Sequence, residues 1–296
     1  MNPSGPVDVT ALPHLAPRAA DANKGDFGRV LVVAGSRGMS GAAALCAGAA
    51  LRGGAGLVRV AVPEGILPLV APVNPCWMTA PLPQDGDGRL AATAHDELVG
   101  LVRASTVAVL GPGLGQSAEV ARLLLAVLAQ TTTPLVLDAD ALNNLVPHLE
   151  QLGPPGRPTV LTPHPGEFAR LSRSDVPTVQ AHRRDMALRF AAERGVVLAL
   201  KGHQTIVTDG RRVYVNGTGN PGMATGGSGD VLGGLIAALI GQGLEAFAAA
   251  QLGVYLHGWA GDLARDELGE VSLIASDLVS YLPRAFQAHD RSRPRP

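Results

Sequence analysis

The apolar residues of this chain form short runs that alternate with longer stretches of helical periodicity. The short runs, each bounded by turn-forming or polar residues, predict strands at residues 29–34, 57–62, 106–110, 135–137, 159–161, 196–200, 205–208 and 212–215. The dipeptide Asp209-Gly210 predicts a hairpin between the last two strands. Ala-rich or amphipathic stretches predict helices at residues 41–51, 118–129, 180–193, 231–240, 245–265 and 275–286.

The order of these elements indicates the fold class. Strands that are apolar on both faces and alternate with helices are typical of a mostly parallel sheet that helices cover on both faces. We therefore predict an α/β fold. We expect the Pro-rich residues 1–20 to be a loosely ordered lead-in, residues 21–287 to form one domain and residues 288–296 to be a disordered tail.

A glycine-rich segment, residues 216–230, leads directly into the apolar helix at 231–240. Free N–H groups at a helix N-terminus attract anions, and glycine lets the backbone approach a ligand closely, so the segment predicts a phosphate site. Asp230 at its end has two interpretations, a helix cap or a base that takes a proton from a hydroxyl attacking that phosphate. Six glycines between Gly217 and Gly229 favour the base, because a cap needs only one or two special residues.

Composition excludes several classes of function. The formal net charge is −1 and aromatic residues make up 3% of the chain, so nucleic acid and acidic membranes are not expected partners. The apolar run at 231–240 is too short to span a bilayer, and the N-terminus does not resemble a signal peptide. Cys46 and Cys76 lack metal or redox spacing. We expect a cytoplasmic protein.

Basic residues are used unevenly. Lys24 and Lys201 are the two lysines among 24 basic residues, and Gly follows each of them. Two explanations of these positions are equally good: chance in an Arg-biased composition, or a need for a compact ammonium at both turns. For Lys201, which precedes Gly-His-Gln-Thr205, we favour a phosphate contact by the ammonium and the Thr205 hydroxyl over a solvated turn.

Other polar clusters also follow predicted strands, where the ligand crevice of an open α/β sheet lies. The Gly-rich residues 111–115 with Asp138 imitate a dinucleotide fingerprint only weakly, because Pro112 removes an N–H. Asp138 suits a hydrated metal or ligand hydroxyls, whereas capping and function are equally good interpretations for Asp140. Two prolines stiffen the loop around His164, which favours a ligand contact, and Glu167 either caps the next helix or reaches a metal through water.

Together these motifs resemble the ADP/ATP-dependent NAD(P)H-hydrate dehydratases, which have a ribokinase-like fold. The matching residues occur in family order along nearly the whole chain, and the string from Gly219 to Asp230 is highly specific. The other matching segments are residues 24–28, 34–36, 41–43, 110–115, 138–143, 162–167, 201–205 and 275–278. The resemblance implies repair of hydrated nicotinamide cofactors: phosphorylation of the ring hydroxyl of the S-epimer of NADH hydrate or NADPH hydrate by ADP or ATP, then loss of phosphate.

The resemblance also implies roles for individual residues. Asp230 is the expected catalytic base and, with Ala42, Gly113 and His164, contacts the hydrated cofactor. The expected phosphate-binding residues are Gly227, Ser228 and Gly229, and the expected nucleotide contacts are Lys201, Gly202, His203, Gln204, Thr205 and Gly229. Mg²⁺ is expected to bridge the phosphates, with Asp138 and Glu167 as acids around it and no direct metal ligand assigned.

The resemblance implies a homo-oligomer, for which a tetramer is our expectation, and a separate epimerase in the same pathway, because this chain lacks the residues of the epimerase domain that many family members carry. Three other functions stay open at this point. The first is a kinase for a vitamin-precursor alcohol, which the same glycine-rich loop would serve. The others are an NAD dehydrogenase that uses residues 111–115 and a non-catalytic nucleotide sensor, against which the intact Asp230 argues.

Overall fold

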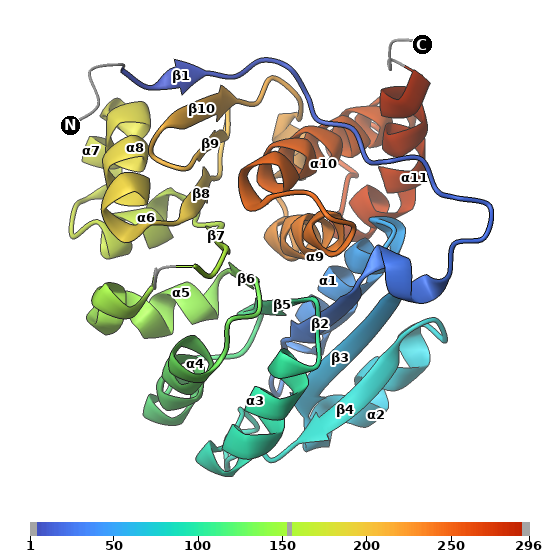
Figure 1. Cartoon of the computed structure of the whole chain (residues 1–296), viewed down its shortest axis with the longest axis vertical. Coiled ribbons are helices and arrows are strands. Elements are labelled where there is room, and N and C mark those ends of the chain that lie inside the picture. The colour runs from blue at the N-terminus through green and yellow to red at the C-terminus, as the bar shows by residue number, and fades with distance from the viewer. Residues whose placement is uncertain (1–4, 153–155, 292–296) are drawn as a thin grey trace.

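The computed structural model describes residues 5–152 and 156–291 of the chain. Its centre is a single sheet with the strand order β1-β10-β9-β8-β7-β6-β5-β2-β3-β4 (Figure 1). Strand β9 is antiparallel to β8 and β10, and the other neighbouring pairs are parallel. The strands are β1 Val7–Asp8, β2 Arg29–Val33, β3 Leu57–Pro63, β4 Met78–Leu82, β5 Val107–Leu110, β6 Leu135–Leu137, β7 Thr159–Leu161, β8 Val197–Leu200, β9 Ile206–Thr208 and β10 Arg212–Val215.

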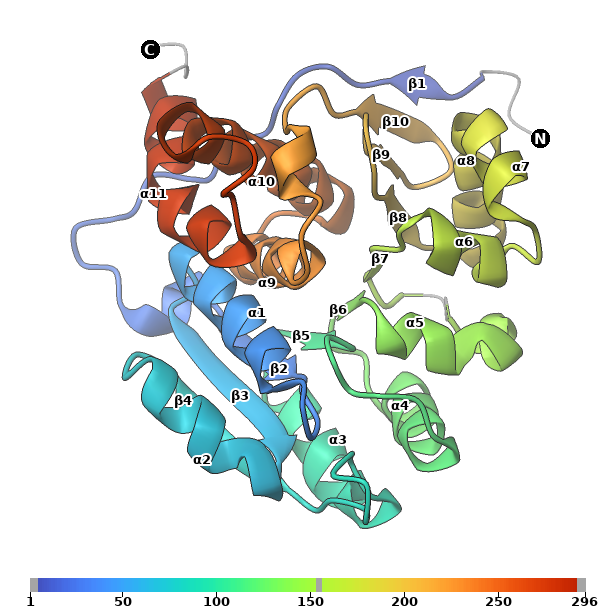
Figure 2. The ribbon, with the colours of Figure 1, turned by 180° about the vertical axis from the view of Figure 1, so that it is seen from behind.

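Helices cover both faces of this sheet (Figures 1 and 2). Side chains alternate along a strand, so Val30 and Val32 of β2 face one core and Leu31 and Val33 face the other. The first core is closed by α1 Ser40–Arg52, α2 Leu67–Val70, α9 Ser228–Gly241, α10 Ala246–Leu268 and α11 Ala275–Arg291. The second is closed by α3 His95–Arg103, α4 Ala118–Gln130, α5 Asp140–Leu145, α6 Pro165–Leu171, α7 Val176–Ala181 and α8 Arg183–Arg194. The predicted α/β class is confirmed.

Most predicted elements are present, with one correction. The helix predicted at 180–193 is two helices, α7 and α8, because His182 between them has non-helical backbone angles (φ −129°, ψ 30°). Asp175 starts α7 by accepting a hydrogen bond from the Thr178 amide. Four elements, β1, β4, α2 and α3, were not predicted, and α5 and α6 had no predicted ranges.

The N-terminal segment contacts the rest of the chain at several points. Strand β1 pairs with β10, and Asp8 forms an ion pair with Arg184 of α8 (2.6 Å). The buried Gln251 side chain of α10 donates a hydrogen bond to the Ala11 carbonyl (2.8 Å). At the other end, residues 288–291 of the expected tail continue α11, and residues 292–296 lie outside the described part of the chain. The division into lead-in, domain and tail stays a prediction.

The two edges of the sheet are short or interrupted. Strand β1 has two residues, and β4 carries Pro81, which has no N–H to donate. As for the helices, none within residues 5–152 and 156–291 is both long and apolar enough to cross a membrane.

Candidate active site

The polar motifs of the sequence meet where the parallel strands end. Strands β8, β7, β6, β5 and β2 are consecutive neighbours in the sheet. The segments that follow them carry Lys201, Thr162, Asp138, Gly111 and Gly35, respectively. Because parallel strands end at the same edge of a sheet, these residues are brought to one side of the molecule.

An ion pair lies at the centre of this edge. The Asp138 side chain is 1% exposed, and its Oδ1 atom lies 2.8 Å from Lys201 Nζ. The Thr162 hydroxyl donates to the same oxygen (2.7 Å). Glu167 Oε2 lies 3.9 Å from Lys201 Nζ, so the ammonium faces two carboxylates. Burial alone would lower the pKa of Lys201, but Asp138 and Glu167 outweigh it and raise that pKa.

The second oxygen of Asp138 has no partner. Oδ2 is buried and forms no hydrogen bond within the described residues. A Cβ atom placed on Gly229 would lie 3.6 Å from it and 3.0 Å from Lys201 Nζ. The start of α9 therefore packs directly against the ion pair, and a side chain at position 229 would crowd it.

The first turn of α9 offers free donors. Gly227 precedes the helix with φ +92° and no side chain caps it. Ser228 N–H donates to the Thr225 carbonyl (3.3 Å), whereas the amides of Gly227, Gly229 and Asp230 donate to no atom of residues 5–152 and 156–291. Unpaired amides at a helix N-terminus bind anions, as the glycine-rich sequence predicted.

Asp230 lies in that turn and is suited to carry a proton. Burial raises its pKa from 3.8 to about 7, and the Asp138 carboxylate adds to the shift, while Lys201 opposes it. A carboxyl with a pKa near neutrality exchanges protons readily at physiological pH. Its position, within the first turn and without a capping hydrogen bond, favours the base over the cap.

Ala42 and Gly113 are also brought together. Gly113 has φ +63°, and a Cβ added to it would lie 3.0 Å from Ala42 Cβ and 2.9 Å from Met39 Cβ. The Ser36 hydroxyl donates to the Gly113 carbonyl (2.8 Å) and holds the two segments together. One helical turn after Ala42, the Leu45 side chain meets Gly227, so this small-residue contact adjoins the glycine-rich loop.

His164 and Glu167 cap α6. The His164 Nδ1 atom accepts hydrogen bonds from the Gly166 and Glu167 amides, and the Glu167 carboxylate accepts from His164 N–H (2.8 Å). This reciprocal box orients the imidazole, whose exposed fraction is 52%. The cap interpretation of Glu167 is thus confirmed, and His164 remains accessible to a ligand.

The structure gives Asp140 a contact that neither interpretation had predicted. It is the first residue of α5, but its carboxylate accepts from Gly115 N–H (2.9 Å) instead of from the α5 amides. The buried Asn144 side chain holds the same loop by donating to the Gly115 carbonyl (2.9 Å) and accepting from Ser117 N–H (3.1 Å). Both residues therefore shape the loop that carries Gly113.

The expected nucleotide contacts share one loop. Gly202, His203 and Gln204 are exposed between β8 and β9, and the Thr205 hydroxyl donates to the Gly202 carbonyl (2.9 Å). Lys201 points from this loop into the site, whereas Lys24 lies on a 3-10 helix before β2, at the opposite end of the strands. The two lysines therefore do not belong to one site.

His257, for which the sequence predicted no function, contacts the site. It lies on α10, is 9% exposed, and its Nε2 atom is 2.9 Å from the Ser228 carbonyl oxygen. Desolvation lowers the pKa of His257 to about 4, so its ring is neutral. The only feature of the sequence that could have indicated this contact is the position of His257 within a mostly apolar helical stretch.

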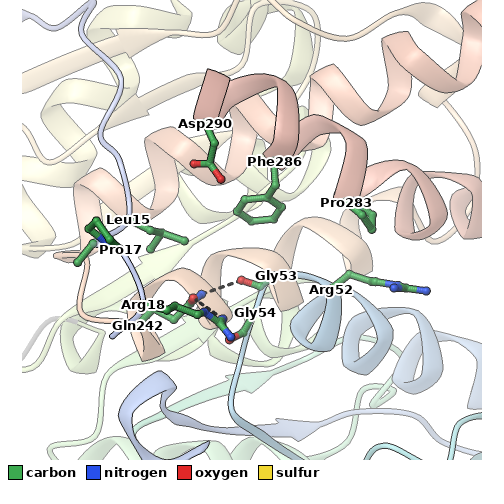
Figure 3. A pocket seen from close by; sticks show the side chains of 11 residues that line it. Leu15, Pro17, Arg18, Arg52, Gly53, Gly54, Gln242, Pro283, Phe286 and Asp290 are labelled. Carbon is green, nitrogen blue, oxygen red and sulfur yellow. Dashed lines mark hydrogen bonds between the residues drawn. The ribbon is translucent and has the colours of Figure 1, made fainter. Parts of the chain in front are cut away.

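A pocket of about 480 Å³ lies away from this site (Figure 3). Arg52 and Gly53, at the C-terminal end of α1, line it together with Gln242, which follows α9, and Phe286 of α11. The catalytic candidates are at the N-terminal ends of α1 and α9, roughly 20 Å away along helices of this length. The pocket therefore takes no part in the chemistry proposed below.

Comparisons with known proteins point to one activity. A family model described as NAD(P)H-hydrate dehydratase matches residues 30–284. A bifunctional NAD(P)H-hydrate repair enzyme of Moorella thermoacetica is 46% identical over 272 residues, which are 91% of this chain and 51% of that protein. The chain thus spans about half the length of that relative. An ADP-dependent (S)-NAD(P)H-hydrate dehydratase of Xanthomonas campestris is 38% identical over 90% of both chains.

A solved structure agrees. The ADP/ATP-dependent NAD(P)H-hydrate dehydratase from Bacillus subtilis, co-crystallised with ATP and Mg²⁺, superposes with a TM-score of 0.80 at 33% identity. The superposition covers 93% of this chain and 94% of that one.

Proposed function

Because this chain belongs to the NAD(P)H-hydrate dehydratase family and has a ribokinase-like fold, we propose that it converts the S-epimer of NADH hydrate or NADPH hydrate back to the reduced cofactor with ADP or ATP as co-substrate. The observation that carries the proposal is Asp230, a carboxyl with a pKa of about 7 beside the free amides of α9. Such a pair can deprotonate an alcohol and hold the phosphoryl group that the alcohol attacks.

The first step is phosphoryl transfer. Asp230 takes the proton of the ring hydroxyl, and the hydroxyl oxygen forms a bond to the terminal phosphorus while the bond from that phosphorus to the nucleotide breaks. ADP leaves as AMP, or ATP as ADP. The second step expels the new phosphate together with a ring proton, which restores the double bond. Hydroxide is a poor leaving group and phosphate is a good one, so the co-substrate makes the dehydration feasible.

Charge stabilisation comes from the start of α9 and from Lys201. The N–H groups of Gly227, Gly229 and Asp230 hold the transferred phosphate, whereas the expected Ser228 N–H is already bonded to the Thr225 carbonyl. The Lys201 ammonium offsets the negative charge of that phosphate. Residues Gly202 to Thr205, next to Lys201 in the chain, contact the nucleotide.

A divalent cation fits this site through one protein atom. Asp138 Oδ2 is a buried carboxylate oxygen without a partner, and Mg²⁺ commonly takes one or two carboxylates besides phosphate oxygens and water. One oxygen of Glu167, Oε2, is used by the α6 cap, and the role of Glu167 as an acid near the ion stays a prediction. No cluster of three or more acidic, His or Cys ligands occurs in the described ranges. When bound, Mg²⁺ neutralises charge on those phosphates.

The hydrated ring lies against small residues. Ala42 and Gly113 form a flat contact that the adjacent hydrogen bond from Ser36 fixes. His164, oriented by its own cap, contacts the substrate from the other loop. A bulky side chain at position 42 or 113 would push these two segments apart and disturb the surface that we assign to the ring.

One experiment tests the proposal. The protein is incubated with enzymatically prepared NADH hydrate and ADP, and the near-ultraviolet absorbance of the dihydronicotinamide is followed. We expect the absorbance to return as AMP and phosphate appear in equal amounts. AMP without absorbance would indicate a kinase that releases a stable phosphate ester, and no recovery with either ADP or ATP would contradict the proposal.

A substitution tests the base. Asp230→Asn should bind ADP but turn over about 10² to 10⁴ times more slowly, the range that general bases contribute. The matched control is Asp175→Asn, an exposed cap of α7, which should turn over normally. An Asp230→Asn variant with normal turnover would remove Asp230 from the mechanism.

Three expectations stay predictions: assembly into a homo-oligomer such as a tetramer, a cytoplasmic location, and a separate epimerase that supplies the S-epimer.

A further inference from the structure

Helix α10 holds the glycine-rich loop at several points. The Thr218 hydroxyl donates to the Tyr255 carbonyl (2.9 Å), and Gly219 N–H donates to Asp262 Oδ2 (2.8 Å). A Cβ added to Gly258 would collide with Thr218 (2.3 Å to Oγ1). These contacts lie three to four residues apart, so they share one face of the helix.

A further contact of α10, made by a residue outside this series, reaches the phosphate-binding turn itself. His257 Nε2 lies 2.9 Å from the Ser228 carbonyl and 3.4 Å from the Ser228 hydroxyl. A carbonyl oxygen can only accept, so Nε2 must carry the hydrogen. Because desolvation keeps the ring neutral, with a pKa of about 4, this donor is present throughout the physiological pH range.

The position of the Ser228 carbonyl matters for the neighbouring amide. The peptide group that contains this carbonyl also contains Gly229 N–H, and a peptide group is planar. A hydrogen bond that fixes the oxygen therefore fixes the direction of the Gly229 N–H, one of the free donors. The start of α9 has no side-chain cap of its own, so this restraint comes from another helix.

We propose that His257 is a positioning residue that aims the Gly229 amide at the transferred phosphate by donating a hydrogen bond to the Ser228 carbonyl. This inference rests on the proposed function. Because His257 is buried against the Ser228 carbonyl, we expect its effect in the rate of the chemical step and not in substrate binding. Misplacing a phosphate donor by about 1 Å can cost about 10²-fold in rate.

The test compares three variants with the wild type. His257→Leu removes the donor, and His257→Gln keeps an N–H that can reach the carbonyl. Gln251→Leu is the matched control, because Gln251 is an equally buried polar residue of α10 that bonds to Ala11 instead. Each kcat is divided by the fraction of folded protein, measured by circular dichroism.

We expect His257→Leu to lower kcat about 10- to 100-fold with the KM for NADH hydrate unchanged. His257→Gln should restore most of the rate, and Gln251→Leu should lose stability but keep its kcat. The pH profile of kcat/KM should have the same midpoint in all variants, because a neutral His257 does not titrate there. Equal kcat in His257→Leu and Gln251→Leu would overturn the proposal.

A second measurement separates this inference from the proposed function. If the wild type does not dehydrate NADH hydrate, the proposed function fails, and amide hydrogen exchange then tests His257 alone. We expect the hydrogen-bonded amides of Ser228 and Val231 to exchange at least about tenfold faster in His257→Leu than in Gln251→Leu, as for any loosened turn. Equal protection in the two variants would overturn the role of His257 even in an active enzyme.

Discussion

Replacing Asp230 with asparagine should stabilise the folded protein at alkaline pH. Burial raises the pKa of Asp230 from 3.8 to about 7, and Asp138 adds to this shift, so the folded chain holds the proton more tightly than the unfolded chain does. The resulting stabilisation is fully present below pH 3.8 and is lost as the pH rises to about 7. Asparagine does not ionise, so the variant avoids that loss.

The size of the effect follows from the shift. A change of roughly three pKa units corresponds to about 4 kcal/mol, at about 1.4 kcal/mol per unit. Water screens part of this because Asp230 is only partly buried, so we expect about 2 kcal/mol. With an unfolding entropy of about 2.1 cal/mol/K per residue, 2 kcal/mol raises the Tm of a chain of this length by about 3 °C.

The assay is thermal unfolding without ligands, followed by circular dichroism between about pH 4 and pH 9. The Tm curves of the wild type and Asp230→Asn should approach each other at the acidic end and separate by about 3 °C at pH 8. Asp175→Asn, on an exposed cap, should show no gain at pH 8. A constant difference at every pH, or none at pH 8, would refute the reasoning, because neither follows from an ionisation near neutrality.

Three further predictions concern the same site. Since Asp230 must be ionised to act as a base, kcat/KM should rise about tenfold per pH unit below about pH 7 and then level off; a flat profile would contradict this. Lys201→Met leaves the buried Asp138 carboxylate unpaired, so urea unfolding should show a loss of about 3 kcal/mol that adding Asp138→Asn partly recovers. Gly113→Val puts a β-branched side chain at φ +63° and within 3.0 Å of Ala42 and Met39, so the loop must shift. The KM for NADH hydrate should rise about tenfold and the Tm should fall, while the KM for ADP stays unchanged.

The sequence predicted the fold well where burial imposes a pattern. Strands such as β6, apolar on both faces, were found at the correct residues. The edge strand β4 was missed because it pairs with one neighbour and carries Pro81, so it lacks a continuous apolar run. The break at His182 was missed because a single change in backbone angles leaves the helical pattern around it intact.

The site was predicted in part. The sequence predicted that Asp138 and Lys201 each follow a strand. Their contact depends on the order of the strands in the sheet. No local sequence pattern gives that order for two residues that are 63 positions apart. The cap by Glu167 could be predicted because Glu167 follows His164 by three residues, the spacing of a capping box. The role of His257 depends on how α10 packs against the start of α9, which only the tertiary structure shows.

The ends of the sheet bear on how copies of this chain can associate. An unpaired strand edge invites another chain to add a strand, but β1 offers only two residues and β4 has a proline. Within the described residues, both edges disfavour a continuous intermolecular ladder. We therefore expect copies of this chain that associate to do so through helical surfaces, an arrangement that would leave every subunit's sheet closed to its neighbours.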